Sequence, residues 1–445
     1  MNLVDKISRI VIVAIIAQFL LIKRFVELEV DNAQIIDFSL YYNFATIVLV
    51  YAFIKFKDPI NPITLFVPFL YLLSYSFIRL SSDQIPLSPK TLLIIKISIF
   101  CYLLFASLNI SKRPSNFIQI SNQSRKNLLY FITIMGAITF LLECVRFGYV
   151  PIFMMFSIDT YNDSLDKMIN FLHYFVYLLI VVPVWAYVFF KEGVISKKVF
   201  YRVIFVAIFV TFNYLSKQLI LLFILSFFMA YITYNKFNTL LFLKGMIAII
   251  TLITIINFIR FETYDSQNTD DKAEFFRSIA GIEDDNVTLT EATFVEYVSK
   301  RYSAMERMVV YSDKIDFFGF GMYTFRPILS LLLLEKTGFV ERKPELNSEL
   351  NVGTYMIDPY LDFGFVGVVV LNSFYGFIAN RFYYQFKNNR KEAIIKFAFI
   401  IQCMLMGMFI NYFNTMVIWL CIFVNKILLG GLISRIDRKQ LAQVK

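Results

Sequence analysis

Long apolar runs alternate with short polar connections over nearly the whole chain. Runs that can cross about 30 Å of hydrocarbon as a helix recur roughly every 20 to 35 residues, as in a bundle of membrane-spanning helices. The pattern therefore predicts an all-α, polytopic membrane protein of about twelve transmembrane helices. We expect these spans near residues 7–22, 38–54, 60–78, 91–110, 127–145, 169–190, 199–215, 218–234, 240–259, 355–380, 394–411 and 413–432.

One long polar segment, residues 260–351, interrupts the apolar pattern. It contains 11 Lys and Arg against 17 Asp and Glu, and charged or unpaired backbone groups are costly in hydrocarbon. We therefore expect a large loop that stands in water beside the membrane. The predicted organisation is nine spans in residues 1–259, the loop in 260–351, and three spans with a tail in 352–445.

Within the loop, helical spacing places an arginine on an apolar face. The residues of that face are Phe294, Tyr297, Val298, Met305, Met308 and Val309. Arg301 falls on the same stripe and Arg307 on the far side, and a cation on an apolar face must snorkel, pair with an anion or bind a ligand. Two further apolar stretches, Met322–Leu334 and Gly148–Ile158, are too short to span, and we expect them to lie at the outer membrane surface.

Composition and charge placement support a membrane protein. Hydrophobic residues are 58% and charged residues 17% of the chain, and the mean hydropathy is +0.64. The net charge of +10 comes from Lys and Arg in alternate short loops, a pattern that orients helices in a membrane and does not indicate nucleic acid. It predicts cytoplasmic termini and an outer position for residues 260–351.

The sequence shows no metal-binding or nucleotide-binding signature, and we expect neither a metal nor a cofactor. The four cysteines, Cys101, Cys144, Cys403 and Cys421, have neither zinc-ligand nor disulfide-framework spacing, so we expect free thiols.

The candidate chemistry gathers at the predicted outer face. Four cations lie there: Lys217 between two spans, Arg260 at the end of another, Arg301, and Arg326 at the start of the Met322–Leu334 stretch. Guanidinium groups bind phosphate oxygens bidentately, so cations that meet at a membrane face can form a diphosphate site. The alternative is that each cation simply snorkels to the interface. Arg307 is a further candidate for substrate contact.

A second set of candidates leads into the span at 355–380. Asn351, Thr354 and Tyr355 are placed to contact a ligand, and Asp362 lies near the membrane surface, where a carboxylate must be paired or useful. Gly364 and Gly367 permit close helix packing. The alternative is a helix cap with a packing notch, in which Asp362 pairs with an arginine.

A second carboxylate and the single histidine also lie at the predicted outer face. Glu143 lies at the outer end of the span at 127–145, and His173, a candidate for substrate binding, lies at the outer end of the span at 169–190.

The long outer loop, then Asn351 and Thr354, then the stretch Leu361-Asp-Phe-Gly364 with Gly367, resemble the Wzy-type O-antigen and capsule repeat-unit polymerases. The turn that ends at Lys217 is similar to an outer turn of that family, with lysine at the family's arginine. The resemblance implies a glycosyltransferase of the bacterial inner membrane, which joins undecaprenyl-diphosphate-linked oligosaccharides without metal on the periplasmic side. It implies a lipid-linked donor and acceptor, with a chain-length regulator and a flippase as candidate partners.

The resemblance assigns roles to the candidates. Arg301 and Arg260, with Lys217 and Arg326, would hold the diphosphate, and Asp362 or Glu143 would be the base. Asn351, Thr354 and Tyr355 would contact sugar, Tyr355 through stacking. The Arg307-to-Gly319 spacing departs by one residue from a spacing seen in some members, and the loop lacks the histidine of the related O-antigen ligases. A lipid-linked oligosaccharide flippase, a ligase and a non-catalytic partner of a polysaccharide complex are the alternatives.

Overall fold

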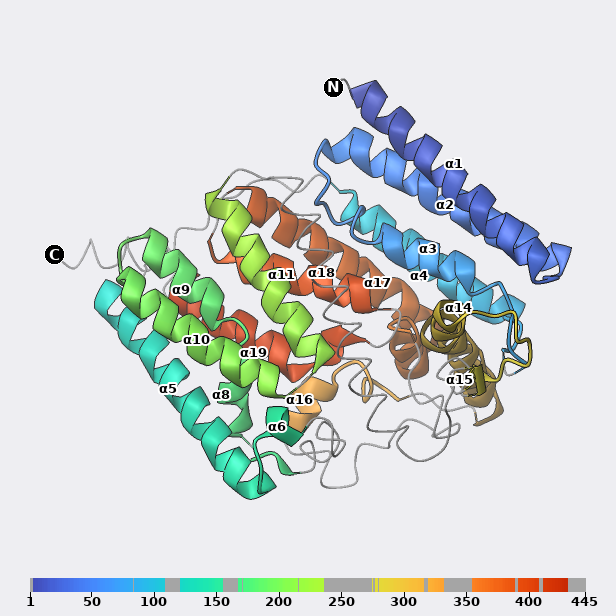
Figure 1. The fold of residues 1–445 in the computed structure, drawn as a ribbon. Helices are drawn as coiled ribbons and strands as arrows, with labels where there is room; N and C mark the ends of the chain where they lie inside the picture. The colour runs from blue at the N-terminus through green and yellow to red at the C-terminus, as the bar shows by residue number, and fades with distance from the viewer. Residues whose placement is uncertain are drawn as a thin grey trace. The chain divides into compact units, whose positions relative to one another are not determined.

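The computed structural model describes residues 3–82, 84–108, 121–154, 167–169, 171–214, 216–235, 274, 277–278, 280–315, 319–331, 354–388, 391–407 and 411–430. These residues form helices and connecting turns, without a strand among them (Figure 1). The chain divides into two compact units. Unit 1 comprises Met1–Ile110, Thr269–Tyr383 and Cys403–Met416; unit 2 comprises Ser111–Asn268, Tyr384–Gln402 and Val417–Lys445.

Unit 1 begins with a pair of long helices, α1 (Leu3–Glu27) and α2 (Asn32–Phe56), which run side by side (Figure 1). The side chain of Asp31 caps α2 by accepting the Ala33 N–H. The core between the helices is aromatic, and the rings of Phe25 and Phe38 meet edge to face at 5.0 Å. The remaining helices of unit 1 are α3 (Val67–Tyr75), α4 (Pro89–Ala106), α14 (Leu289–Phe294), α15 (Lys300–Ile315), α16 (Arg326–Leu331) and most of α17 (Ile357–Lys387).

Unit 2 is built around α5 (Asn122–Phe147), α9 (Val182–Lys191) and α10 (Lys197–Asn213), which pack on one another (Figure 1). It also contains α6 (Pro151–Met154), α8 (His173–Leu178), α11 (Lys217–Tyr234), and most of α18 (Ala393–Met406) and α19 (Met416–Asn425). The predicted continuous helix over 169–190 is interrupted between α8 and α9. Pro183 supplies no N–H and its ring crowds the carbonyl four residues earlier, which favours a break in the helix at this point.

Four helices in the described part of the chain have the length and apolar composition to cross a bilayer, consistent with a membrane protein. They are Asn32–Phe56, Pro89–Ala106, Asn122–Met154 and Ile357–Lys387. They coincide with four of the predicted spans, whereas the span at 60–78 contains only the nine-residue α3. The span at 240–259 lies outside the described residues. The number of twelve spans therefore stays a prediction.

Some of these helices present apolar side chains outward in stripes. On α5 the exposed residues recur at helical spacing, and Val145 is 81% exposed. Such stripes are typical of a surface that faces lipid, because exposure of an apolar surface of this extent to water is unfavourable. The large exposed apolar residues of α5 are Phe131, Ile134, Ile138, Leu141, Leu142 and Val145.

The polar residues of each unit gather at the helix ends. In unit 2, the Arg125 guanidinium lies 2.9 Å from Glu192 and donates to the Leu428 carbonyl, and Lys391 also pairs with Glu192. Arg125 lies near the start of α5, and Glu143 lies near the opposite end of the same helix. Loops that the charge pattern assigns to one side of a membrane thus contact one another at one end of unit 2.

In unit 1, too, connections predicted to lie on the same side of the membrane contact one another at the helix ends. Tyr383 donates to the Asp58 carboxylate at 3.1 Å, which joins two connections predicted to be cytoplasmic. The polar segment meets connections predicted to be outer, because Glu306 accepts from the Ser88 backbone N–H at 2.8 Å and Glu291 binds Arg24. Within unit 1, the described part of the 260–351 loop therefore lies with the two other connections predicted on its side.

Candidate functional site

The Leu361–Gly364 stretch breaks α17. Phe363 has φ −142° and ψ 17°, and Gly364 has φ 59° and ψ −145°, so the helix stops and restarts here. The Gly364 conformation is accessible to glycine and strained for any other residue. The stretch predicted to hold a carboxylate near the membrane surface and a packing glycine is therefore the point where a helix near the start of a predicted span is discontinuous.

A turn from the polar segment docks onto this break. The Gly319 N–H donates to the Leu361 carbonyl at 2.9 Å, and the Phe320 N–H donates to the Asp362 carbonyl at 3.1 Å. The two carboxylate oxygens of Asp362 then accept the Tyr323 and Thr324 N–H groups at 3.1 and 2.6 Å. Four hydrogen bonds thus fix the turn to the broken helix, and Asp362 is fully buried beneath it.

Two glycines permit the close approach of these backbones. A Cβ on Gly319 would lie 2.5 Å from Asp362 Oδ1, and a Cβ on Gly367 would lie 2.1 Å from the Pro359 carbonyl oxygen. Both contacts are shorter than real Cβ atoms allow, and the Gly367 contact is to backbone that cannot easily move. Gly367 therefore permits a close backbone approach, but to Pro359 of α17 itself rather than to a neighbouring helix as predicted.

A second carboxylate and an asparagine complete this region of unit 1. Asn414 donates through Nδ2 to the Tyr323 carbonyl at 2.6 Å and to Asp358 Oδ2 at 2.7 Å. It thereby joins the 411–414 turn, the docked turn and the start of α17. Asn414 was not predicted, because it falls inside the predicted span at 413–432, and Asp358 was assigned no role.

The helix that carries Arg301 lies against the start of α17. Thr354 Oγ1 is 3.3 Å from Met305 Sδ, and the Tyr360 hydroxyl donates to Asp313 Oδ1 at 3.2 Å. The predicted apolar face is buried at Val298, Met305, Met308 and Val309, and Arg301 is half-buried. A π-helical turn at Val295–Ser299 precedes α15, so the predicted helix is not uniform.

Three residues predicted to contact substrate in this region differ in how far they are buried. Thr354 and Tyr355 are each 1% exposed, and Tyr355 packs edge to face on Phe69 at 5.7 Å. Stacking of Tyr355 on a sugar is not compatible with this burial, because no face of the ring is open. Arg326, at the first position of α16, is exposed.

Other candidates are only partly described. Arg260 and Asn351 lie outside the described residues, as does the side chain of Lys217, whose backbone begins α11. Arg307 is half-buried on α15. The described contacts bring Arg301, Thr354 and Asp362 onto neighbouring elements of unit 1, and no described contact joins the arginine to the carboxylate.

In unit 2, Glu143 and His173 form a buried pair. His173 Nδ1 lies 2.9 and 3.0 Å from the two Glu143 carboxylate oxygens. The Ile169 N–H donates to the same carboxylate at 2.9 Å, and the Tyr214 hydroxyl donates to it as well. Glu143 is fully buried and His173 is 5% exposed. The donors already bound to Glu143 make it a positioning group rather than a free base.

One atom of this cluster lacks a partner. His173 Nε2 is buried and has no hydrogen bond to any described residue. An unmet buried polar atom costs about 1–3 kcal/mol, so it calls for an explanation. Tyr214 was not predicted, because a contact across 71 positions leaves no pattern in the sequence.

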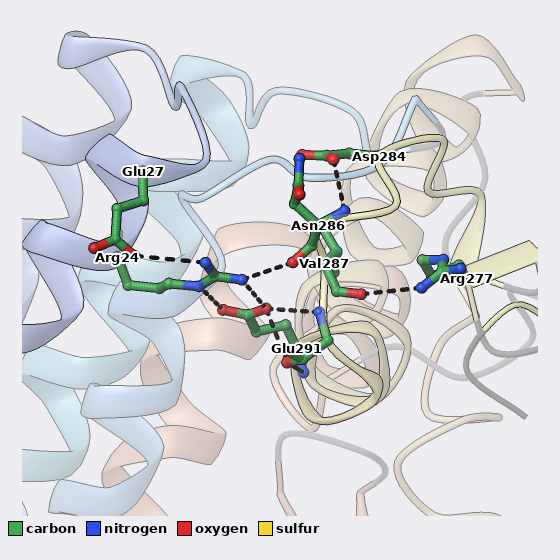
Figure 2. A network of polar contacts seen from close by, with 8 residues as sticks. Arg24, Glu27, Arg277, Asp284, Asn286, Val287 and Glu291 are labelled. Atoms are coloured by element: carbon green, nitrogen blue, oxygen red, sulfur yellow. Dashed lines mark hydrogen bonds and ion pairs between the residues drawn. The ribbon is translucent and has the colours of Figure 1, made fainter.

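Arg24 of α1 holds the described start of the polar segment (Figure 2). Its guanidinium binds the Glu291 carboxylate through two nitrogens, at 2.7 and 3.0 Å, and donates to the Asn286 carbonyl at 2.7 Å. Glu291 also closes a capping box with Thr288 at the start of α14. The Arg24 guanidinium lowers the pKa of the Glu291 carboxyl, because the charged form accepts these hydrogen bonds.

No protein-family model, curated protein or solved structure matches the chain.

Proposed function

We propose that the protein polymerises undecaprenyl-diphosphate-linked oligosaccharide units into O-antigen or capsular polysaccharide, on the periplasmic face of a bacterial inner membrane. The observation that carries the proposal is the docking of the polar segment onto the broken start of α17 in unit 1. Arg301 and Arg326 stand on the two elements of that segment that flank the docked turn. A cap that brings guanidinium groups to the end of a membrane helix suits a diphosphate leaving group.

In this proposal the growing chain on its lipid diphosphate is the donor. Arg301 and Arg326 bind the diphosphate, which departs as the acceptor hydroxyl attacks the sugar carbon. Asp362 positions this cap, because its two oxygens accept N–H groups of the docked turn that leads into the Arg326 helix. A preactivated diphosphate needs charge stabilisation more than it needs a metal.

The proposal is tested by complementation of a strain that lacks the gene. Arg301→Ala, Arg326→Ala and Asp362→Asn are compared with wild type for polysaccharide length on gels, at matched amounts of membrane protein. Loss of one phosphate-binding arginine is expected to reduce polymer at least about tenfold, since a charge-assisted pair contributes about 1.5–3 kcal/mol. Lys314→Ala is the matched control, an exposed cation on the same helix as Arg301. Normal polymer length in all three variants would remove the site from the proposal.

The same strain separates the alternatives. Without a polymerase, the surface carries a single repeat unit, whereas without a flippase it carries none. The broken α17 is the feature that favours a flippase, because transporters bind substrates at discontinuous helices. A non-catalytic partner would leave lipid-linked units unextended when the purified protein is supplied with them.

A further inference from the structure

We propose that His173 Nε2 is the hydrogen-bond acceptor of a second binding site, in unit 2, whose ligand presents a neutral hydroxyl group. The inference rests on the cluster of His173, Glu143 and Tyr214. It concerns unit 2 alone and does not depend on the proposed polymerase activity.

The carboxylate fixes the tautomer of the imidazole. An ionised carboxylate can only accept hydrogen bonds, and both Glu143 oxygens lie within 3.0 Å of His173 Nδ1. Nδ1 therefore carries a proton, and in the neutral ring Nε2 presents a lone pair. This arrangement makes Nε2 an acceptor aimed away from the carboxylate.

The ring is also held in one orientation. The His173 ring meets the rings of Tyr177 and Tyr214 edge to face, at 4.3 and 5.3 Å. The Tyr214 hydroxyl and the Ile169 N–H anchor the Glu143 carboxylate, so the carboxylate cannot turn away from the imidazole. Such restraint from several sides is the feature of a pre-positioned functional group.

Two observations point to a ligand rather than to a core histidine. His173 is 95% removed from solvent, and Nε2 still has no partner among the described residues, whereas buried polar atoms are normally satisfied. Two positions earlier, Phe171 has φ 64°, a backbone conformation that bulky residues rarely adopt and that is concentrated at functional sites.

The chemistry of the cluster selects the ligand. An anion would be repelled by the Glu143 carboxylate, whose described partners include no Lys or Arg. A bound metal ion needs several protein ligands, and the described residues contain no suitable group of three His, Cys, Asp or Glu side chains. A neutral O–H donor satisfies Nε2 without adding charge to the interior.

The test uses the fact that the chain contains a single histidine. Full-length protein with nitrogen-15 in its histidine, held in hydroxyl-free amine-oxide micelles, gives one pair of ring signals. We expect a neutral ring with the proton on Nδ1. Octyl β-glucoside should then shift the Nε2 signal in a saturable way and leave Nδ1 nearly unchanged. The fully O-methylated glucoside, which has no O–H donor, should leave both signals in place.

Chemical modification of the same sample tests independently whether glucoside covers Nε2. Diethylpyrocarbonate should acylate Nε2, and glucoside at twice its midpoint concentration should slow that reaction about threefold. The proposal fails if Nε2 carries a proton at pH 7.5, if saturating glucoside moves neither signal, or if the methylated analogue acts equally.

Variants show whether Glu143 sets the tautomer. Glu143→Gln should give a mixture of both neutral tautomers and lose the glucoside response. Tyr214→Phe retains the Glu143 carboxylate and should retain the proton on His173 Nδ1. This variant therefore still tests the tautomer assignment if Glu143→Gln does not fold. A wild-type tautomer in a folded Glu143→Gln protein would overturn the assignment.

Discussion

Two buried carboxylates, Asp362 in unit 1 and Glu143 in unit 2, are engaged in different ways. Asp362 accepts two backbone N–H groups from one turn, so its described contacts determine the path of the chain. Glu143 accepts one backbone N–H and the side chains of His173 and Tyr214, so its contacts determine the state of an imidazole. Burial alone does not distinguish these roles, since both carboxylates are fully buried. The identity of the donors does.

Removal of the Asp362 carboxylate should give the largest effect on stability. Asp362→Ala leaves the Tyr323 and Thr324 N–H groups without an acceptor beneath the docked turn, and should lower the free energy of unfolding in detergent by about 3 kcal/mol or more. Asp362→Asn retains one acceptor oxygen and should lose roughly half as much. Asp37→Ala, an exposed carboxylate on α2, is the control. An Asp362→Ala protein as stable as wild type would show that the turn does not depend on the carboxylate.

The sequence predicted the features that periodicity and composition carry. Helical spacing identified Val298, Met305, Met308 and Val309 as one buried face, and apolar length identified four helices able to span a bilayer. Loop charge grouped the connections that the contacts then join, such as Arg24 with Glu291. These features are local in sequence, or repeat along it.

Features that depend on a distant partner could not be predicted in this way. The sequence marked Leu361–Gly364 as unusual, but the break in α17 is fixed by a turn some 40 residues earlier, which no pattern within α17 encodes. Tyr355 is an aromatic residue of the type that stacks on sugars, but its ring is buried beside Phe69. Asn414 falls inside the predicted span at 413–432, and its two partners are 91 and 56 positions away in the sequence.

A smaller effect is expected where one of several donors is removed. Tyr214→Phe deletes one hydrogen bond to Glu143, while His173 and the Ile169 N–H continue to satisfy the carboxylate. The free energy of unfolding in detergent should fall by about 1 kcal/mol, less than for Asp362→Ala. Tyr201→Phe, at an exposed position on α10, should leave stability unchanged. A loss equal to that of Asp362→Ala would mean that Glu143, too, is chiefly a structural carboxylate.

The smallest effect should be local, at a third carboxylate that is only partly buried. Glu291 has a pKa below its ordinary value of 4.5, first because of the hydrogen bond from Arg24. A carboxyl with a lowered pKa stabilises the folded contact above that ordinary value, and the contribution is lost as pH falls through the folded pKa. Amide exchange over residues 286–294, corrected for its intrinsic pH dependence, should therefore rise several-fold between about pH 5 and pH 3, with α2 unaffected. Glu291→Gln cannot ionise, so its exchange should already be raised at neutral pH and show no such step; an identical step in this variant would assign the transition to another group.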